Sequence, residues 1–150
     1  MSDIDIREIV QCTCLRLRRT TRRITQIYDR FLEPAGLTIN QFGLLARLYG
    51  AGLRGETLTI GMLAERVGMD PTTLNRSLKP LAASGLVANG SNPADQRVRA
   101  VLITDDGIAR LRDAVPLWRK AQAQIDNALG IDTTVALNGL LELSYARLPE

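Results

Sequence analysis

The sequence predicts a mainly helical protein with one small β-hairpin, in which a helix-turn-helix and the hairpin lie between long helices from both chain ends. Apolar residues recur at helical spacing over much of the 150 residues. Residues 58–104 differ, because two short helical patterns there are followed by two stretches typical of β-strands. A helix-turn-helix that leads directly into a hairpin is the layout of a winged helix-turn-helix.

The first helix of the pair is bounded by two residues with defined roles. The Thr59 hydroxyl can cap its first turn, and Gly68 tolerates the left-handed backbone that ends a helix. Its apolar residues follow the spacing of one helix face and are Ile60, Leu63, Ala64 and Val67. The second helix begins after Asp70, because Asp is a good N-cap and Pro71 fits the first helical position.

The second helix has an apolar face and an opposite polar face. Leu74, Leu78 and Leu81 are spaced to face inward. The polar residues on or beside the other face are Thr72, Thr73, Asn75, Arg76 and Lys79. Arg and Asn make paired hydrogen bonds to base edges in a major groove, whereas Thr and Lys suit phosphate contacts. The same five residues are also compatible with an ordinary solvated helix surface.

The hairpin is predicted to pair residues 86–89 with residues 98–103 across a polar tip at 90–94. Asp95 and Arg97 are two residues apart on an extended segment, so both side chains can point to the same side. Arg97 could enter a narrow minor groove. The alternative is a surface ion pair between the two, worth about 0–1 kcal/mol.

Three motifs resemble the MarR family of bacterial winged-helix transcription regulators: LTINQFGLLARL, LTIGMLAERVGMDPTTLNRSLKPLAASGLV and DQRVRAVLITDDG. The resemblance covers residues 12–148 and is most specific at the wing. It implies a transcriptional repressor that binds double-stranded DNA as a homodimer and dimerises through its first and last helices. It also implies the placement of single residues: Thr72, Thr73, Asn75 and Arg76 in the major groove, Lys79 near the backbone, Arg97 in the minor groove, and Asp95 holding Arg97 in place.

Composition excludes several other classes. The chain has no histidine, two cysteines and no phosphate-binding glycine loop, so we expect neither an enzyme, nor a metal site, nor a cofactor. It has no apolar run long enough for a membrane span and no secretory leader, which predicts a cytoplasmic protein. The net charge is only +3, but 17 Arg against 2 Lys favours an anionic partner.

Both chain ends are predicted to form long apolar helices. The first holds seven arginines between Arg7 and Arg30, which either pair with acids of a partner chain, such as Glu142 or Asp126, or extend the positive field toward DNA. A helix over 105–129 ends at Gly130, and Asp132 is expected to cap the last helix. We therefore expect residues 1–35 and 105–150 to form a dimerisation lobe and residues 36–104 the DNA-binding lobe, although the end helices could instead pack on each other.

An effector pocket for a small aromatic or anionic molecule is predicted at the junction of the two lobes, with Tyr28, Phe42, Leu45 and Trp118 as candidates besides their ordinary core role. Cys12 and Cys14 suggest an alternative, a thiol-based redox sensor whose reactivity the nearby arginines favour. On one helix, residues two apart point to nearly opposite sides, so the two cysteines would not bridge each other. A further alternative is a winged helix that binds only protein, which would lack the steep salt dependence of DNA binding.

Overall fold

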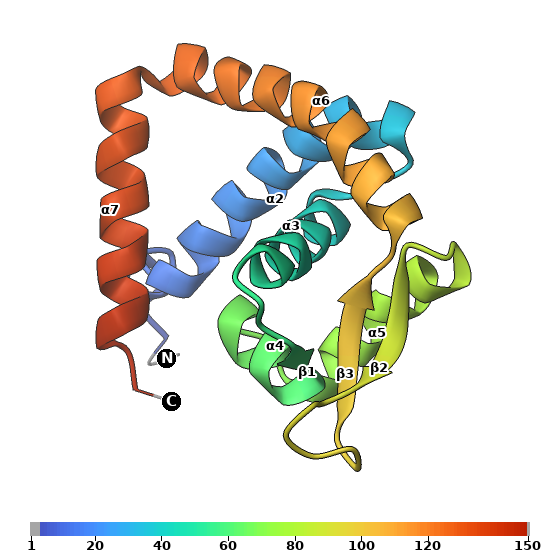
Figure 1. The fold of residues 1–150 in the computed structure, drawn as a ribbon. Helices are drawn as coiled ribbons and strands as arrows, with labels where there is room; N and C mark the ends of the chain where they lie inside the picture. Colours follow the sequence, from blue (N-terminus) through green and yellow to red (C-terminus); the bar gives the residue numbers. More distant parts are fainter. Residues whose placement is uncertain (1–3, 150) are drawn as a thin grey trace. The chain divides into compact units, whose positions relative to one another are not determined.

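The computed structural model describes residues 4–149, whose helices and strands are drawn in Figure 1. The chain forms two compact units: one holds the residues up to Phe31 and those from Trp118 onwards, and the other is Leu32–Leu117. Within the described residues, the strands all lie in the second unit. A mainly helical chain with a small β-wing and a unit built from its first and last helices confirms the fold class predicted from the sequence.

The second unit contains a three-stranded antiparallel sheet in which β3 is central and pairs with β1 and β2. Leu58 lies opposite Val101, and Val87 lies opposite Ile103. The first hairpin strand begins one residue and ends two residues later than predicted, whereas the second begins one residue later and ends at the predicted Ile103. The two-residue β1 was not predicted, because a strand so short shows no alternation. The elements are η1 (Glu33–Ala35), α3 (Ile39–Leu53), β1 (Leu58–Thr59), α4 (Ile60–Val67), α5 (Pro71–Ala83), β2 (Val87–Ser91), β3 (Arg99–Ile103) and the first part of α6 (Asp105–Leu129).

Leucines from α3, α4, α5 and β1 form the core of the second unit. The inward residues predicted for the helix-turn-helix are buried: Leu63 and Ala64 on α4, and Leu74, Leu78 and Leu81 on α5. Burial of a leucine side chain stabilises a fold by about 1.5–3 kcal/mol relative to exposure. The core therefore fixes the rotation of α5 about its own axis, and with it the direction in which the polar face points.

The ends of the two helices are set by local hydrogen bonds, as predicted. The Thr59 hydroxyl accepts a hydrogen bond of 3.2 Å from the Met62 N–H at the start of α4. Gly68 has a φ of 66° and ends α4 in the left-handed region. Asp70 is the N-cap of α5, and Pro71 is its first residue. The turn between α4 and α5 is thus specified by the sequence at both of its ends.

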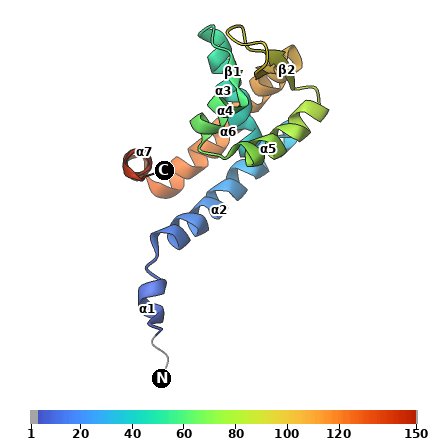
Figure 2. The same ribbon diagram turned by 90° about the horizontal axis from the view of Figure 1, so that it is seen from below.

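The first unit begins with two helices rather than one. α1 (Ile6–Ile9) and α2 (Thr13–Leu32) are separated by residues 10–12, and Figure 2 shows this break. The prediction of one continuous first helix is wrong here. Cys12 lies in the break and Cys14 in α2, so the argument that one helix turns the two thiols apart does not apply.

The unit is completed by the second part of α6 and by α7 (Ile131–Arg147). Gly130, with a φ of 83°, precedes α7 directly and is its N-cap residue. Asp132 therefore lies inside the first turn, and its predicted capping role is wrong. Many apolar side chains of α7 are exposed, among them Val135, Leu140 and Leu143, and so is Leu148 directly after the helix. None of the helices in residues 4–149 is both long and apolar enough to span a membrane.

Candidate nucleic-acid interface

The polar face of α5 is fully on the surface of the second unit. Thr72, Thr73, Asn75, Arg76 and Lys79 are all exposed, while the leucines of the same helix are buried. The structure therefore presents the five residues together from one short helix. Their contacts with DNA stay a prediction.

Thr73 also has a structural task at the start of α5. Its backbone N–H donates to Asp70 Oδ1 at 2.9 Å, and its hydroxyl donates to Asp70 Oδ2 at 2.5 Å. These two bonds, the hydroxyl bond first, hold the pKa of Asp70 below its ordinary value of 3.8. Since its hydroxyl proton is committed to the cap, Thr73 has only oxygen lone pairs and its methyl group left to offer a ligand.

The tip of the wing, residues 92–98, is an ordered turn held by its own side chains. Asn92 Oδ1 accepts a hydrogen bond of 3.0 Å from the Ala94 N–H, and Asp95 Oδ1 accepts one of 3.0 Å from the Arg97 N–H. The Asp95 carboxylate thus supports the backbone that carries Arg97, which differs from the ion pair considered as the alternative. Gly90 and Ser91, predicted in the tip, belong to β2.

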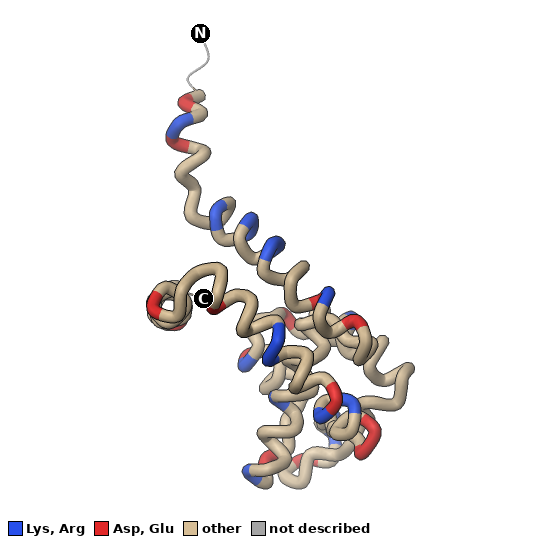
Figure 3. Tube along the Cα trace, turned by 90° about the horizontal axis from the view of Figure 1, so that it is seen from above, with Lys and Arg blue, Asp and Glu red and all other residues tan. Residues whose placement is uncertain are grey.

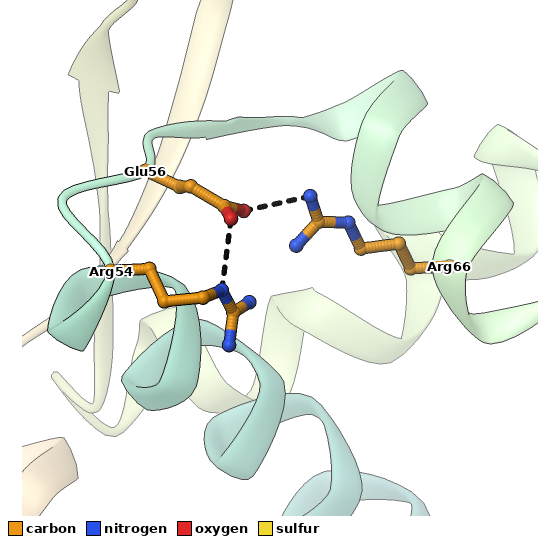
Figure 4. A network of polar contacts seen from close by, with 3 residues as sticks. All are labelled: Arg54, Glu56 and Arg66. Carbon is orange, nitrogen blue, oxygen red and sulfur yellow. Dashed lines mark hydrogen bonds and ion pairs between the residues drawn. The ribbon is translucent and has the colours of Figure 1, made fainter.

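An ion-pair cluster that the sequence did not reveal joins the loop after α3 to α4 (Figure 4). Glu56 Oε1 is 2.9 Å from Arg54 Nε, and Glu56 Oε2 is 2.7 Å from Arg66 Nη2. Hydrogen bonds from Arg54 and then Arg66 lower the pKa of Glu56 below its ordinary value of 4.5. Arg54 directly follows α3 and Arg66 is on α4, so the carboxylate links these two helices.

The arginines of the first unit form the densest basic segment of the chain. Figure 3 shows them along α2 as blue stretches of the tube, and all of them are exposed: Arg16, Arg18, Arg19, Arg22, Arg23 and Arg30. The two predicted roles of these arginines, to pair with acids of a partner chain or to extend the positive field toward DNA, stay predictions.

The four candidates for an effector pocket are divided between the two units. Phe42 and Leu45 are buried in the second unit, and Leu45 is a fully enclosed core residue. Tyr28 and Trp118 are half-buried and belong to the first unit, where the Tyr28 hydroxyl donates a hydrogen bond of 2.5 Å to Gln122 Oε1. The predicted pocket of all four stays a prediction. Cys12 and Cys14 are free and exposed.

Comparison with known proteins assigns the chain to a family. A model of the MarR family matches residues 35–98, which include the helix-turn-helix and the wing tip. The M. tuberculosis transcriptional regulator MosR is 35% identical, with a TM-score of 0.74 over 90% of this chain and 96% of that chain. The chain belongs to the MarR family. It is a DNA-binding transcription regulator of the winged helix-turn-helix type and not an enzyme, as predicted.

Other MarR-type proteins extend this finding. MosR in complex with DNA is 36% identical, with a TM-score of 0.75 over 91% of this chain and 99% of that chain. A Bacillus subtilis protein described as an organic hydroperoxide resistance transcriptional regulator is 28% identical over 104 residues, 69% of this chain and 68% of that protein. A mutant of MarR itself from E. coli, complexed with operator DNA, shares the fold with a TM-score of 0.81, at 24% identity over 97% of this chain and all of that chain.

Proposed function

We propose that this MarR-family regulator is a repressor that binds a pseudo-palindromic operator as a homodimer and releases it when a small molecule binds. One observation carries the DNA-binding part. The exposed face of α5 holds Asn75, Arg76 and Lys79 on a helix whose rotation is fixed by its buried leucines, within a chain 36% identical to a regulator solved with DNA.

In this proposal two reading elements contact the DNA, α5 and the tip of the wing, and each has its own task. α5 enters the major groove, where Arg76 and Asn75 contact base edges and Thr72 contacts phosphate or a thymine methyl group. Lys79 neutralises phosphate. Arg97 enters the minor groove from a turn that Asp95 holds.

The homodimer is proposed from the apolar side chains that the first unit leaves exposed. Val135, Leu140 and Leu148 are 65%, 61% and 70% exposed, and Ile6 and Leu15 add to them on α1 and α2. An extensive apolar surface is typical of an interface between subunits. We assign dimerisation to this unit; the predicted lobes divide at 35/36 and 104/105, whereas the compact units divide at 31/32 and 117/118. In such a dimer, the DNA-binding units of the two subunits would contact half-sites whose centres are about 10 bp apart.

Selection of bound sequences from random DNA, at a stated salt concentration, gives the operator and its half-site spacing. Fluorescence anisotropy with that operator then compares Arg76→Ala and Arg97→Ala with Arg112→Ala, an exposed arginine of α6 in the same unit. We expect each reading-element variant to weaken binding by about 1–3 kcal/mol and Arg112→Ala to leave it unchanged. Unchanged affinity in both reading-element variants would contradict the assignment.

Salt dependence separates DNA binding from a winged helix that binds only protein. Neutralisation of several phosphates makes the affinity for DNA fall steeply with salt concentration. Lys79→Gln should reduce the slope of log affinity against log salt concentration by about 1. Asn75→Ala should keep the slope and relax sequence preference. A protein with no salt-dependent affinity for any duplex would support the protein-binding alternative.

A thiol-based sensor is a second candidate, favoured by the exposure of Cys12 and Cys14 and by the name of the Bacillus subtilis relative. A hydroperoxide would oxidise one thiol to a sulfenic acid and leave as the alcohol. A second thiol would then condense with it to a disulfide and release water. Mass spectrometry after stoichiometric cumene hydroperoxide tests this: oxidised Cys12 or Cys14 with lost DNA binding, prevented by Cys→Ser changes, supports the sensor. Unmodified cysteines contradict it.

A further inference from the structure

One face of the wing changes from apolar to polar along its length. Residues directly opposite each other in an antiparallel strand pair share a face. The opposed pairs on this face are Val87 and Ile103, Asn89 and Val101, and Ser91 and Arg99. At one end of the pair Val87 and Val101 are buried, whereas toward the loop between β2 and β3 the side chains of Asn89, Ser91 and Arg99 are exposed.

This face is the one that the helices cover. α5 contacts β2, and α3 contacts β3. Val101 also lies opposite Leu58 of β1, and both side chains are buried, so the core is on their side of the sheet. On the other face Ala88 and its neighbour across the strands, Leu102, are exposed. Asn89, Ser91 and Arg99, here called the polar strip, therefore continue the helix-covered face beyond the core, toward the wing loop (Figure 1).

The side chains of the polar strip are uncommitted donors. Among residues 4–149, Arg99 forms no ion pair, and the side chains of Asn89 and Ser91 form no hydrogen bond. None of the residues that share this face of β2 and β3 is acidic. A guanidinium, a hydroxyl and an amide group all donate hydrogen bonds, and a guanidinium can give a phosphate two parallel ones. The strip therefore suits an anion with several oxygens.

The geometry of a duplex determines which anion comes next to the strip. In the proposed function α5 lies in the major groove, and Arg97 at the tip of the wing enters the minor groove. One sugar–phosphate strand separates a major groove from the adjacent minor groove, so this strand has to pass between α5 and the wing tip. The polar strip lies on the wing face that is turned toward the helices, and its residues precede and follow the tip in the chain.

We propose that the polar strip binds the phosphates of the strand between the two grooves, with Arg99 as the cation and Asn89 and Ser91 as neutral donors. This proposal rests on the placement of α5 and Arg97 given under the proposed function. Phosphate contacts fix the register of a protein on the duplex but carry no base information. The strip would thus hold the wing at a set position relative to α5 and leave sequence preference to the two reading elements.

The first test measures the charge of the contact by anisotropy with the selected operator. Arg99→Gln should weaken binding about tenfold and reduce the slope of log affinity against log salt concentration by about 1. The sequence preference should stay the same. Arg99→Lys keeps the positive charge and should keep the slope. Unchanged affinity and slope in Arg99→Gln would overturn the proposal, and so would a changed sequence preference.

The second test uses two adjacent residues of β2 that lie on opposite faces. Asn89→Asp places a negative charge on the polar strip and should weaken operator binding about tenfold, because it repels the phosphates. Ala88→Asp places the same charge on the other face, at an exposed position, and should weaken binding about threefold or less, because solvent and salt screen it. Thermal unfolding of both variants shows that they are folded. Equal losses of affinity would contradict the assignment to this face.

The third test locates the contact on the DNA. Each phosphate of the operator is replaced in turn by an uncharged methylphosphonate. Replacement between the two grooves should weaken wild type about tenfold and Arg99→Gln much less, because that variant has already lost the contact. Equal losses in the two proteins at every phosphate would overturn the proposal.

The variants Arg76→Ala and Arg97→Ala separate this proposal from the proposed function. If they weaken operator binding while Arg99→Gln and Asn89→Asp do not, the polar strip is wrong and the two reading elements stand. If none of the four variants weakens binding, the proposed placement of α5 and the wing on DNA is wrong as well.

Discussion

Arg110 Nη1 donates a hydrogen bond of 3.0 Å to the backbone carbonyl oxygen of Ala35. Ala35 ends η1 and is followed by Gly36, whose φ of 67° turns the chain toward α3. Carbonyl groups at the end of a helical turn lack partners within it, and a cationic donor suits them. Arg110 therefore fastens the first part of α6 to the turn that precedes α3.

Replacing Arg110 by Met should destabilise the second unit by about 1–3 kcal/mol, since it leaves a part-buried carbonyl without its charged donor. Urea unfolding followed by circular dichroism measures the change. Arg112→Met, at an exposed position on the same helix, should stay within about 0.5 kcal/mol of wild type. Equal effects of the two variants would show that the Ala35 contact contributes nothing.

Gly107 is required by close packing. A Cβ at this position would lie 2.1 Å from the Leu86 carbonyl oxygen and 2.7 Å from Ile103 Cγ1. Gly107→Ala should cost about 1–3 kcal/mol because the backbone must move. Gly43→Ala is the control: its Cβ would meet only the end of the Arg47 side chain at 4.0 Å, and it should stabilise α3 by up to about 1 kcal/mol. A thermal scan in which Gly107→Ala matches wild type would contradict the packing argument.

The Glu56 cluster predicts a dependence of stability on pH. The pKa of Glu56 is lower in the folded state than its ordinary value of 4.5, so its stabilising contribution is complete above that value. It is lost as the pH falls below 4.5 and through the lower folded pKa. Glu56→Gln should therefore flatten the acid side of the stability curve, measured by urea unfolding at pH 3 to 7. Glu65→Gln, an exposed change on α4 outside the cluster, should leave the curve unaltered.

The wing predicts a difference between two substitutions at one position. Asp95→Ala removes the acceptor of the Arg97 N–H, whereas Asp95→Asn keeps an acceptor oxygen and removes the charge. If backbone support is what positions Arg97, Asp95→Ala should weaken operator binding about fivefold and Asp95→Asn much less. Anisotropy titrations in one salt compare them. Equal losses would show that the charge of Asp95, and not its hydrogen bond, supports the wing.

Much of the second unit could be predicted from sequence because its decisive interactions are local. Thr59, Gly68 and Asp70 act within three residues of their own position, so their residue types identify the helix ends. The rotation of α5 follows in the same way from its leucine spacing. The position of the polar face of α5 is predictable for the same reason, because this face lies opposite the buried leucines.

The errors occurred where local signals are weak or distant residues decide. No Gly or Pro marks the break at residues 10–12, and Gly130 itself precedes α7 so closely that Asp132 falls inside the helix. Arg66 reaches Glu56 from ten positions along the chain, a pairing that no fixed spacing announces. Tyr28 of α2 donates a hydrogen bond to Gln122 of α6, 94 positions along the chain, and periodicity cannot show which faces of two such helices meet.

Thr104 connects the two ends of the wing and the helix that follows it. Its hydroxyl donates to the Gly85 carbonyl oxygen at 2.6 Å, just after α5, and accepts from the Gly107 N–H at 3.0 Å in the first turn of α6. One side chain therefore ties the exit of α5 to the entry of α6. A displacement of the first turn of α6 relative to the end of α5 would have to stretch one of these two hydrogen bonds, so the shortest path between the two helices runs through a single hydroxyl group and not through the hairpin.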